Sequence, residues 1–329
     1  MERPPFTLPS RAINLIAEIS AQIERYAIRL EQEDGLRLRK ANRIKTIHSS
    51  LAIEGNKLTE GQVSDIIDGK TVVAPLKDIQ EVKNALKTYE LFPSLDPFKE
   101  EDLLCAHGVM MEALIDNPGH YRNKGVGVYS EKGLVHMAPS ATMVPQLMGN
   151  LFEWLHESDD HLLIRSCVFH YEFEFIHPFM DGNGRMGRLW QSVILAKLHP
   201  LFQYLPVENM VYANQEEYYK AIAVSDKKGE SGPFIEFMLG EILKALKSHQ
   251  GTELDVVKGV AKGVAKGVVK ETELLDFIHR NPRLSAKDAA SLLGLSPRHV
   301  QRLFASLRDS GKIHRMGGRK NGYWEIIKN

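Results

Sequence analysis

The sequence predicts a mainly α-helical protein with few strands, in which a helical body is followed by a smaller C-terminal domain. Apolar residues recur every three or four positions through most of residues 10–248, which is the spacing of one helix face. Within that body, residues 125–137 have the pattern of a β-hairpin around a Gly-containing turn. A Gly- and Lys-rich repeat at 257–270 then separates the body from the last segment of the chain.

The composition is that of a globular protein whose two parts differ in charge. The 329 residues are 43% apolar and 26% charged, and this length suffices for two or three domains with ample cores. The formal net charge is zero, so no general attraction to nucleic acid or membranes follows. Residues 252–329 contain 15 Lys and Arg against 8 Asp and Glu, whereas the preceding residues contain 27 against 34. A basic C-terminal part and an acidic body predict different partners for each.

Nothing in the sequence predicts export or membrane insertion. The first residues include Pro4 and Pro5 and lack the apolar core of a secretory signal. No run approaches the roughly 18 apolar residues of a membrane span. Cys105 and Cys167 both fall in apolar helical patterns and are expected to be buried free thiols. We therefore expect a cytoplasmic protein with no membrane contact.

Two helices are predicted before residue 57. Ser10 is a predicted N-cap for the first, and the second runs from about residue 36 to a C-cap at Gly55-Asn56. Glu54 would then lie in the last helical turn, where the helix dipole disfavours a negative charge. This placement favours a cationic partner for Glu54, but a solvated glutamate at a helix end explains it equally well.

Further helices follow along the body, and the hairpin interrupts them. The spacing predicts helices over 78–91, 98–114, 145–156, 161–176 and 233–246, of which 161–176 is nearly all apolar and is expected to be central. His170 in that helix is expected to be a hydrogen-bonded core residue. None of the 13 histidines has the HExxH spacing of a zinc site, so no zinc is expected.

Residues 177–188 form the stretch with the densest chemistry in the chain. His177 titrates near neutral pH and is a candidate general base, and the Asp181 carboxylate is a typical Mg²⁺ ligand beside phosphates. Small residues at 182–184 precede a helix predicted over 185–199, and backbone N–H groups at such a position bind anions. Arg185 and Arg188 add donor forks suited to phosphate oxygens. These features predict a phosphate-binding site with a base beside it, the alternative being a Gly-rich turn with surface ion pairs.

The same stretch resembles the signature of the Fic family. That signature is His, Pro and Phe, then an acid, Gly-Asn-Gly-Arg and a second arginine three residues on, and every fixed position is present. Ser50 followed by Glu54-Gly55 resembles the inhibitory-helix motif of the Fic subclass that carries this helix ahead of the core. In that subclass the glutamate pairs with the second motif arginine, here Arg188, and blocks the place of the ATP γ-phosphate.

The resemblance implies a Fic helical core and a protein adenylyltransferase that moves AMP from ATP to a Ser, Thr or Tyr hydroxyl of a target protein, which could be the chain itself. It implies ATP as substrate, Mg²⁺ as cofactor and inhibition by Glu54. The residues that it implies are His177 as the catalytic base; Asp181 for Mg²⁺; Gly182, Asn183, Gly184, Arg185, Met186, Gly187, Arg188 and Tyr219 for ATP; Ser50 and Glu54 for inhibition; and Val126, Val128, Tyr129, Val135 and His136 on a hairpin flap that docks the target. A capping hairpin without a partner, and Tyr219 as plain core, remain the alternatives.

The end of the chain resembles a winged helix-turn-helix. Residues 1–97 are expected to form an N-terminal helical region with the inhibitory helix, 98–248 the catalytic core, 249–270 a linker and 271–329 the winged helix domain. Side chains that could meet DNA are Arg298, His299, Gln301 and Arg302 on the recognition helix and Arg315, Arg319 and Lys320 on the wing. Protein contact or formation of a homodimer is the alternative use of this domain.

Two other functions are compatible with the same residues. Glu54 could orient a water molecule so that the site removes AMP from a modified protein. Alternatively, the chain could be a DNA-binding regulator whose core only senses a nucleotide.

Overall fold

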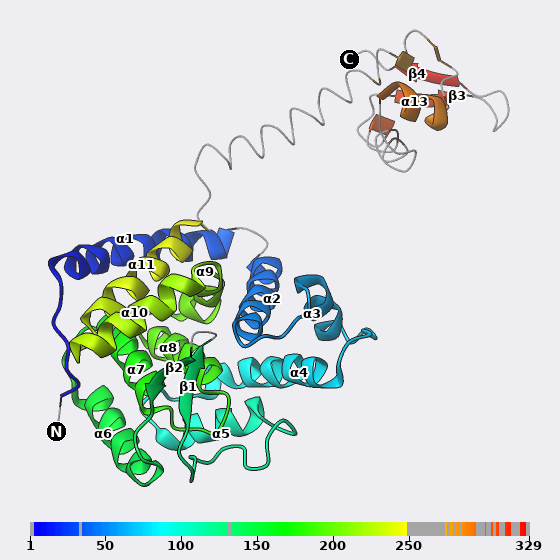
Figure 1. Cartoon of the computed structure of the whole chain (residues 1–329). Coiled ribbons are helices and arrows are strands. Elements are labelled where there is room, and N and C mark those ends of the chain that lie inside the picture. The colour runs from blue at the N-terminus through cyan, green and yellow to red at the C-terminus, as the bar shows by residue number, and fades with distance from the viewer. Residues whose placement is uncertain are drawn as a thin grey trace. The chain divides into compact units, whose positions relative to one another are not determined.

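The computed structural model describes residues 3–32, 35–130, 133–248, 274, 277–278, 281–282, 285–293, 300, 304, 307–308, 313–316 and 323–326. The chain divides into two compact units, Met1–Gln250 and Gly251–Asn329. Regular structure in the described residues is helical apart from two antiparallel strand pairs (Figure 1). The predicted mainly α-helical class is confirmed.

The first unit is built from helices and one strand pair. In chain order they are α1 (Ser10–Gln32), α2 (Gly35–Ile53), α3 (Glu60–Ile67), α4 (Leu76–Leu91), the 3₁₀ helix η1 (Phe92–Ser94), α5 (Glu100–Met110), β1 (Gly127–Ser130), β2 (Gly133–Met137), η2 (Ala141–Met143), α6 (Val144–Glu157), α7 (Leu162–Ile176), α8 (Asn183–Leu198), η3 (Pro200–Gln203), α9 (Val207–Ala213), α10 (Gln215–Lys228) and α11 (Gly232–Ser248).

Helices α7 and α8 form the centre of this unit. Buried residues lie on every side of both helices, which is why α7 shows no apolar stripe in the sequence. The His161 side chain caps α7 by accepting a hydrogen bond from the Leu163 N–H at 3.1 Å. Trp190 of α8 is fully buried. The pair therefore gives the residues between the two helices a rigid support.

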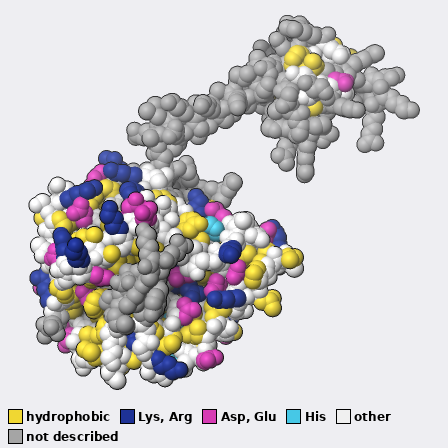
Figure 2. Space-filling model, viewed as in Figure 1, with side chains coloured by type: hydrophobic (Ala, Val, Ile, Leu, Met, Phe, Trp, Pro, Cys, Tyr) yellow, Lys and Arg dark blue, Asp and Glu magenta, His cyan; other side chains and the backbone are white. Residues whose placement is uncertain are grey.

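The remaining helices surround this pair and share its core. In Figure 1, α1 lies along α11, and α2 lies beside α9 and above α4. One hydrophobic core runs from Ala12 of α1 to Leu246 of α11. Residues 1–97 and 98–248 thus contribute to a single packed body. Figure 2 shows acidic and basic side chains interspersed with apolar ones over the visible face of this unit.

The hairpin predicted at 125–137 is present as β1 and β2. Gly127 pairs with Met137 and Val128 with His136, and a register shift follows Val128. Such a bulge bends the strand and increases its twist. Val126 lies just before β1 and is half-buried. For Val128, Tyr129, Val135 and His136 the structure describes only the backbone.

The second unit has its own small core. It contains α13 (Ala286–Leu293) and the antiparallel pair of β3 (Ile313–Met316) and β4 (Tyr323–Ile326), in which Ile313 faces Ile326. Trp324 stacks on Phe304 at 4.7 Å between ring centroids. The backbone of Arg315 lies in β3, whereas Arg298, His299, Gln301, Arg302, Arg319, Lys320 and the linker 249–270 lie outside the described residues. The winged helix remains a prediction.

Two expectations about helix α5 are wrong. Cys105 is exposed, because the buried residues Leu103, Ala106 and Met110 define the opposite face of the helix. Cys167 is buried as expected, and burial raises the pKa of its thiol to about 12. The helix ends at Met110 rather than near residue 114, and Ala113 has a left-handed backbone with φ of 58°. No helix among the described residues combines the length and apolarity needed to cross a membrane.

Candidate functional site

The chain makes a tight reversal between α7 and α8. His177 ends α7 with a left-handed backbone (φ 51°, ψ 60°), and its N–H donates to the Phe173 carbonyl at 2.9 Å. Gly182 precedes α8 and is also left-handed, with φ of 84°. A Cβ at this glycine would meet Met111 Sδ at 2.7 Å. Glycine is needed here both for the backbone conformation and for the space.

Side chains from the core hold this reversal in place. The Asn183 side chain accepts from the Phe179 N–H at 2.8 Å and donates to the Phe179 carbonyl at 2.9 Å. His107 accepts from the Gly119 N–H at Nδ1, so its Nε2 carries the proton and donates to the Asp181 carbonyl at 3.0 Å. Burial lowers the pKa of His107 to about 4, which keeps the ring neutral at physiological pH.

Arg122 joins the hairpin to the same reversal. Its guanidinium is buried and donates to the His177 carbonyl at 2.8 Å and to the Ile176 carbonyl at 3.2 Å. It also donates to the carbonyls of Lys124 and Pro139, which flank the hairpin on its two sides. The two ends of the hairpin and the backbone of His177 therefore share one anchor.

The His177 ring is partly accessible and faces a buried carboxyl group. Its Nδ1 lies 3.9 Å from Glu174 Oε2, and its side chain is 21% exposed. Burial raises the pKa of Glu174 to about 7, against the opposing effect of Arg188. His170 bonds to Gln191 at 2.8 Å and Tyr218 at 3.1 Å, as expected of a core histidine, and burial lowers its pKa to about 3.

Asp181 stands at the mouth of α8 with an accessible carboxylate. Its side chain is 49% exposed, and Oδ1 accepts from the Gly182 N–H at 2.6 Å and from Arg185 at 3.1 Å. Oδ2 takes no hydrogen bond from the described residues. One open carboxylate oxygen beside a phosphate site fits the way Mg²⁺ is held in nucleotide enzymes. The residues present therefore fit this ion.

Arg188 meets the C-terminal end of α2. The buried guanidinium donates to Glu54 Oε1 at 2.7 Å, to the Ser50 carbonyl at 2.9 Å and to Ser50 Oγ at 3.2 Å. Burial alone would lower the pKa of Arg188, but the neighbouring carboxylate of Glu54 raises it above its usual value. A Cβ on Gly184 would collide with Glu54 Oε1. The Glu54 carboxylate therefore lies at the helix mouth, where an anion would bind.

The local structure of α2 directs Glu54 there. Gly55 is left-handed with φ of 90°, its N–H donates to Ala52, and the Asn56 N–H donates to Leu51. These two bonds form a Schellman cap. The dipole of α2 disfavours a negative charge at this end of the helix, and the ion pair of Glu54 with Arg188 offsets that cost.

The other predicted residues divide between surface and core. A Cβ on Gly187 would meet Glu174 Oε1 at 2.8 Å, so this glycine allows close approach of α7 and α8. Met186 is fully buried, and only its backbone could meet a phosphate. Tyr219 is 47% exposed and lies edge-on to buried Tyr218, with ring centroids 5.3 Å apart. An exposed ring is available for stacking on a base.

Several residues at the site were not predicted from the sequence. These are His107 and Arg122, which hold the reversal, and Glu81 of α4, which lies 3.5 Å from the Arg185 guanidinium. Each makes at least one contact with a residue 55 or more positions away. No local sequence signal reports such contacts.

Similar proteins are found along the whole chain. The Fic/DOC family matches residues 97–195. The crystal structure of a Fic family protein from Desulfovibrio desulfuricans G20 is 41% identical, covers 100% of this chain and 99% of its own, and has a TM-score of 0.76. A probable protein adenylyltransferase of Aquifex aeolicus is 26% identical over 302 residues, 85% of each chain. A protein adenylyltransferase Fic of Nematostella vectensis is 28% identical over 58% of this chain and 45% of its own.

Proposed function

Because the chain belongs to the Fic family, we propose that it is a protein adenylyltransferase, which moves AMP from ATP to a Ser, Thr or Tyr hydroxyl of a target protein. The observation that carries the proposal is the convergence of a partly accessible histidine, an open carboxylate and two buried arginines at the mouth of α8. This set matches the requirements of phosphoryl-group chemistry, which are positioning and neutralisation of charge.

In the proposed reaction His177 is the general base. With Nδ1 directed at Glu174, Nε2 is the nitrogen assigned to the target hydroxyl. The hydroxyl oxygen attacks the α-phosphorus, His177 takes the hydroxyl proton, and the bond from the α-phosphorus to the bridging oxygen breaks so that pyrophosphate leaves. Arg185 and Arg188 neutralise the phosphates, and backbone N–H groups at the start of α8 donate to them.

Asp181 is the residue proposed to hold Mg²⁺. The ion would neutralise phosphate oxygens and polarise the reacting phosphate. The bonds from Gly182 and Arg185 both go to Oδ1 of Asp181, which leaves Oδ2 for the ion. Tyr219 is proposed to stack on the adenine.

We propose further that Glu54 inhibits the enzyme. Its carboxylate engages Arg188 and occupies the space beside Gly184, so a phosphate group and Glu54 compete for one cation. An oxygen of Glu54 is already at hydrogen-bonding distance, and the side chain is only 31% exposed. Removal of this carboxylate should therefore open the site.

The test is transfer of label from ATP carrying radioactive phosphorus in the α-position, with Mg²⁺ and purified full-length protein. Wild type, Glu54→Gly and Glu54→Gly/His177→Ala are compared. Label on protein should rise strongly in Glu54→Gly and fall by about 10² to 10⁴ when His177 is also replaced. Glu157→Gly, an exposed glutamate at the end of α6, is the matched control and should behave as wild type.

Other results would redirect the assignment. Equal labelling of wild type and Glu54→Gly would remove the inhibition by Glu54. No labelling of any form, with ATP still bound, would instead favour removal of AMP from a modified protein or nucleotide sensing.

For the C-terminal unit we propose DNA binding, supported by its excess of basic residues. The full chain should bind duplex DNA with an affinity that falls steeply with salt, and Arg315→Glu should weaken binding. Binding that does not respond to salt or to this change would favour protein contact or dimer formation. The cytoplasmic location remains a prediction.

A further inference from the structure

We propose that Glu81 is a positioning residue that holds the inhibitory Glu54 in place through Asn56. Glu81 lies in α4, outside both sequence motifs, and its side chain is 9% exposed. The inference rests on the proposed function in one respect, namely that the mouth of α8 binds the phosphates of ATP. It adds a third component to the pairing of Glu54 with Arg188.

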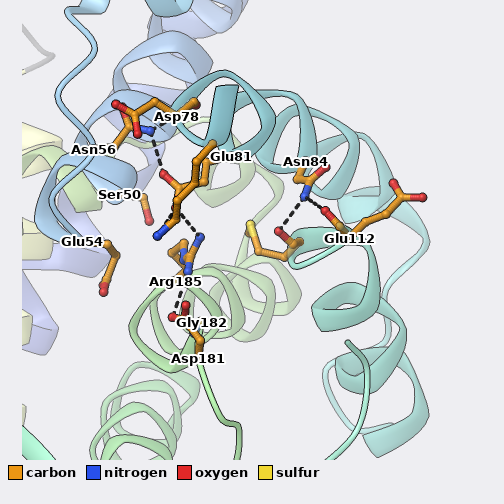
Figure 3. A network of polar contacts seen from close by, with 12 residues as sticks. Ser50, Glu54, Asn56, Asp78, Glu81, Asn84, Glu112, Asp181, Gly182 and Arg185 are labelled. Atoms are coloured by element: carbon orange, nitrogen blue, oxygen red, sulfur yellow. Dashed lines mark hydrogen bonds and ion pairs between the residues drawn. The ribbon is translucent and has the colours of Figure 1, made fainter. Parts of the chain in front are cut away.

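The two oxygens of Glu81 face different parts of the site. Oε2 accepts from Asn56 Nδ2 at 2.8 Å, and Oε1 lies 3.5 Å from Arg185 NH1 (Figure 3). Lys77 Nζ is 4.0 Å from Oε1, at the edge of the same carboxylate. A buried carboxylate is costly unless it is paired, and Arg185 and Lys77 supply that compensation. Glu81 thus meets both cations through Oε1 and keeps Oε2 for Asn56.

Asn56 sets the direction of the chain directly after Glu54 and Gly55. Its side chain donates to the Asp78 carbonyl at 3.2 Å as well as to Glu81, and its Oδ1 accepts from the Leu58 N–H at 3.0 Å. Its own N–H closes the cap on α2. The two bonds from the Asn56 side chain to Asp78 and Glu81 therefore hold the end of α2 against α4.

Arg185 links this arrangement to the phosphate site. It is 3% exposed and contacts two carboxylates, Glu81 and Asp181. Its Nε and NH1 have no hydrogen-bond acceptor among the described residues. A polar chain therefore runs from Asn56 through Glu81 and Arg185 to Asp181 (Figure 3).

Thermodynamic linkage converts this coupling into a measurable change in nucleotide affinity. If Glu81 and Asn56 favour the pose in which Glu54 covers Arg188, their loss must strengthen binding of the phosphates by the same free energy. This gain in phosphate affinity must also depend on Glu54, because Glu81 and Asn56 act on the site only by positioning its carboxylate.

The experiment measures binding of α,β-methylene ATP, which lacks the cleavable bridging oxygen, by calorimetry with Mg²⁺ and full-length protein. Asn56→Ala and Glu81→Ala are each made in wild type and in Glu54→Gly. In wild type each should tighten binding by about three- to tenfold, in the range known for residues that modulate coupling. In Glu54→Gly neither should change the affinity by more than about twofold.

Two further variants separate positioning from general damage. Glu81→Gln retains an oxygen acceptor for Asn56 and should stay within about twofold of wild type. Asn84→Ala removes a buried side chain one turn along α4 that donates to the carbonyls of Met110 and Glu112 (Figure 3). It should lower thermal stability without tightening nucleotide binding.

The outcomes distinguish this proposal from the proposed function. Tighter binding in Glu54→Gly but wild-type affinity in Asn56→Ala and Glu81→Ala would overturn the role of Glu81 alone. A gain that persists in Glu54→Gly would also overturn it, because Glu81 would then act on Arg185 directly. No binding by any form would overturn both proposals.

Discussion

The reversal between α7 and α8 and the end of α2 meet at one arginine, but they are held in different ways. Residues 177–183 are fixed from inside the core by His107, Arg122 and Asn183, all of them buried. Glu54 is held at the surface of the site by one bond from the Arg188 side chain, and Asn56 by two bonds to α4. The contacts of the reversal cannot be lost without disrupting the core, whereas Arg188 could exchange the Glu54 carboxylate for another anion.

This difference suggests how the site can be both precise and regulated. A catalytic base needs a fixed position, because small displacements cost much of the advantage of orientation. An inhibitory group needs the opposite property, since it must leave when substrate or a signal displaces it. Substitutions in the reversal should therefore damage the protein, and substitutions around Glu54 should release activity.

The largest effect is expected at Arg122. Arg122→Ala leaves the carbonyls of Ile176, His177, Lys124 and Pro139 without this donor, and several such losses together should cost about 3 to 5 kcal/mol of unfolding free energy. Thermal unfolding and denaturant titration measure this. Arg11→Ala, which removes an exposed ion pair with Glu236, is the control and should cost under about 1 kcal/mol. Similar costs for the two variants would show that the hairpin and reversal do not depend on Arg122.

Two left-handed glycines provide a matched test of the comparison. Gly182→Ala meets Met111 at 2.7 Å, whereas Gly55→Ala meets nothing within 4 Å, although φ is similar at 84° and 90°. Both substitutions should lower the free energy of unfolding by about 1 to 2 kcal/mol because of the left-handed backbone. The clash at Gly182 should lower it by about 1 to 3 kcal/mol more. Gly182→Ala should also lose transfer activity, while Gly55→Ala should not. Equal stability losses would contradict a tighter packing of the reversal.

The surroundings of Arg188 contain a further buried acid that should respond to pH. Burial raises the pKa of Glu208 from 4.5 to about 7, and Tyr89 donates to it at 3.2 Å. The unfolded chain ionises at lower pH than the native protein, so this group destabilises the fold progressively as pH rises from about 4.5 to about 7, and the full cost is present above pH 7. Glu208→Gln should therefore raise stability by roughly 2 to 3 kcal/mol at pH 8 and much less at pH 5.

The control for Glu208 is an equally buried glutamate with full pairing. Glu241 accepts from Lys244 at 2.6 Å and from Asn214 at 2.9 Å. Glu241→Gln should not stabilise the protein at either pH. If Glu208→Gln gives the same change in unfolding temperature at pH 5 and pH 8, its carboxyl group does not titrate differently in the native state.

The smallest effect is expected at Ser50. Ser50→Ala removes the bond from Arg188 Nε at 3.2 Å but leaves the bonds to the Ser50 carbonyl and to Glu54. Loss of one such bond, about 0.5 to 1.5 kcal/mol, should raise transfer by roughly two- to tenfold. Ser49→Ala is the control, because Ser49 bonds to Asn209 at 3.2 Å and not to Arg188. A Ser50→Ala enzyme as inactive as wild type would place the whole restraint on Glu54.

Much of the fold was predictable because its signals are local. The C-cap at Gly55-Asn56 and the hairpin at 125–137 depend on residues within a few positions of one another. The end of α5 and the exposure of Cys105 were not predictable, because both depend on what packs against that helix. The apolar pattern in the sequence continues to residue 114, whereas the helix in the structure ends at Met110.

For the site, the sequence by itself determined which groups are available: a histidine, an acid, small residues at a helix start and two arginines within residues 177–188. Only the tertiary structure decided their neighbours, through contacts such as Arg122 with His177 and Glu81 with Arg185, 55 and 104 positions apart. Helix periods and caps arise from bonds between near neighbours in the chain. Buried ion pairs between helices depend on how whole helices pack, and no short stretch of sequence contains that information.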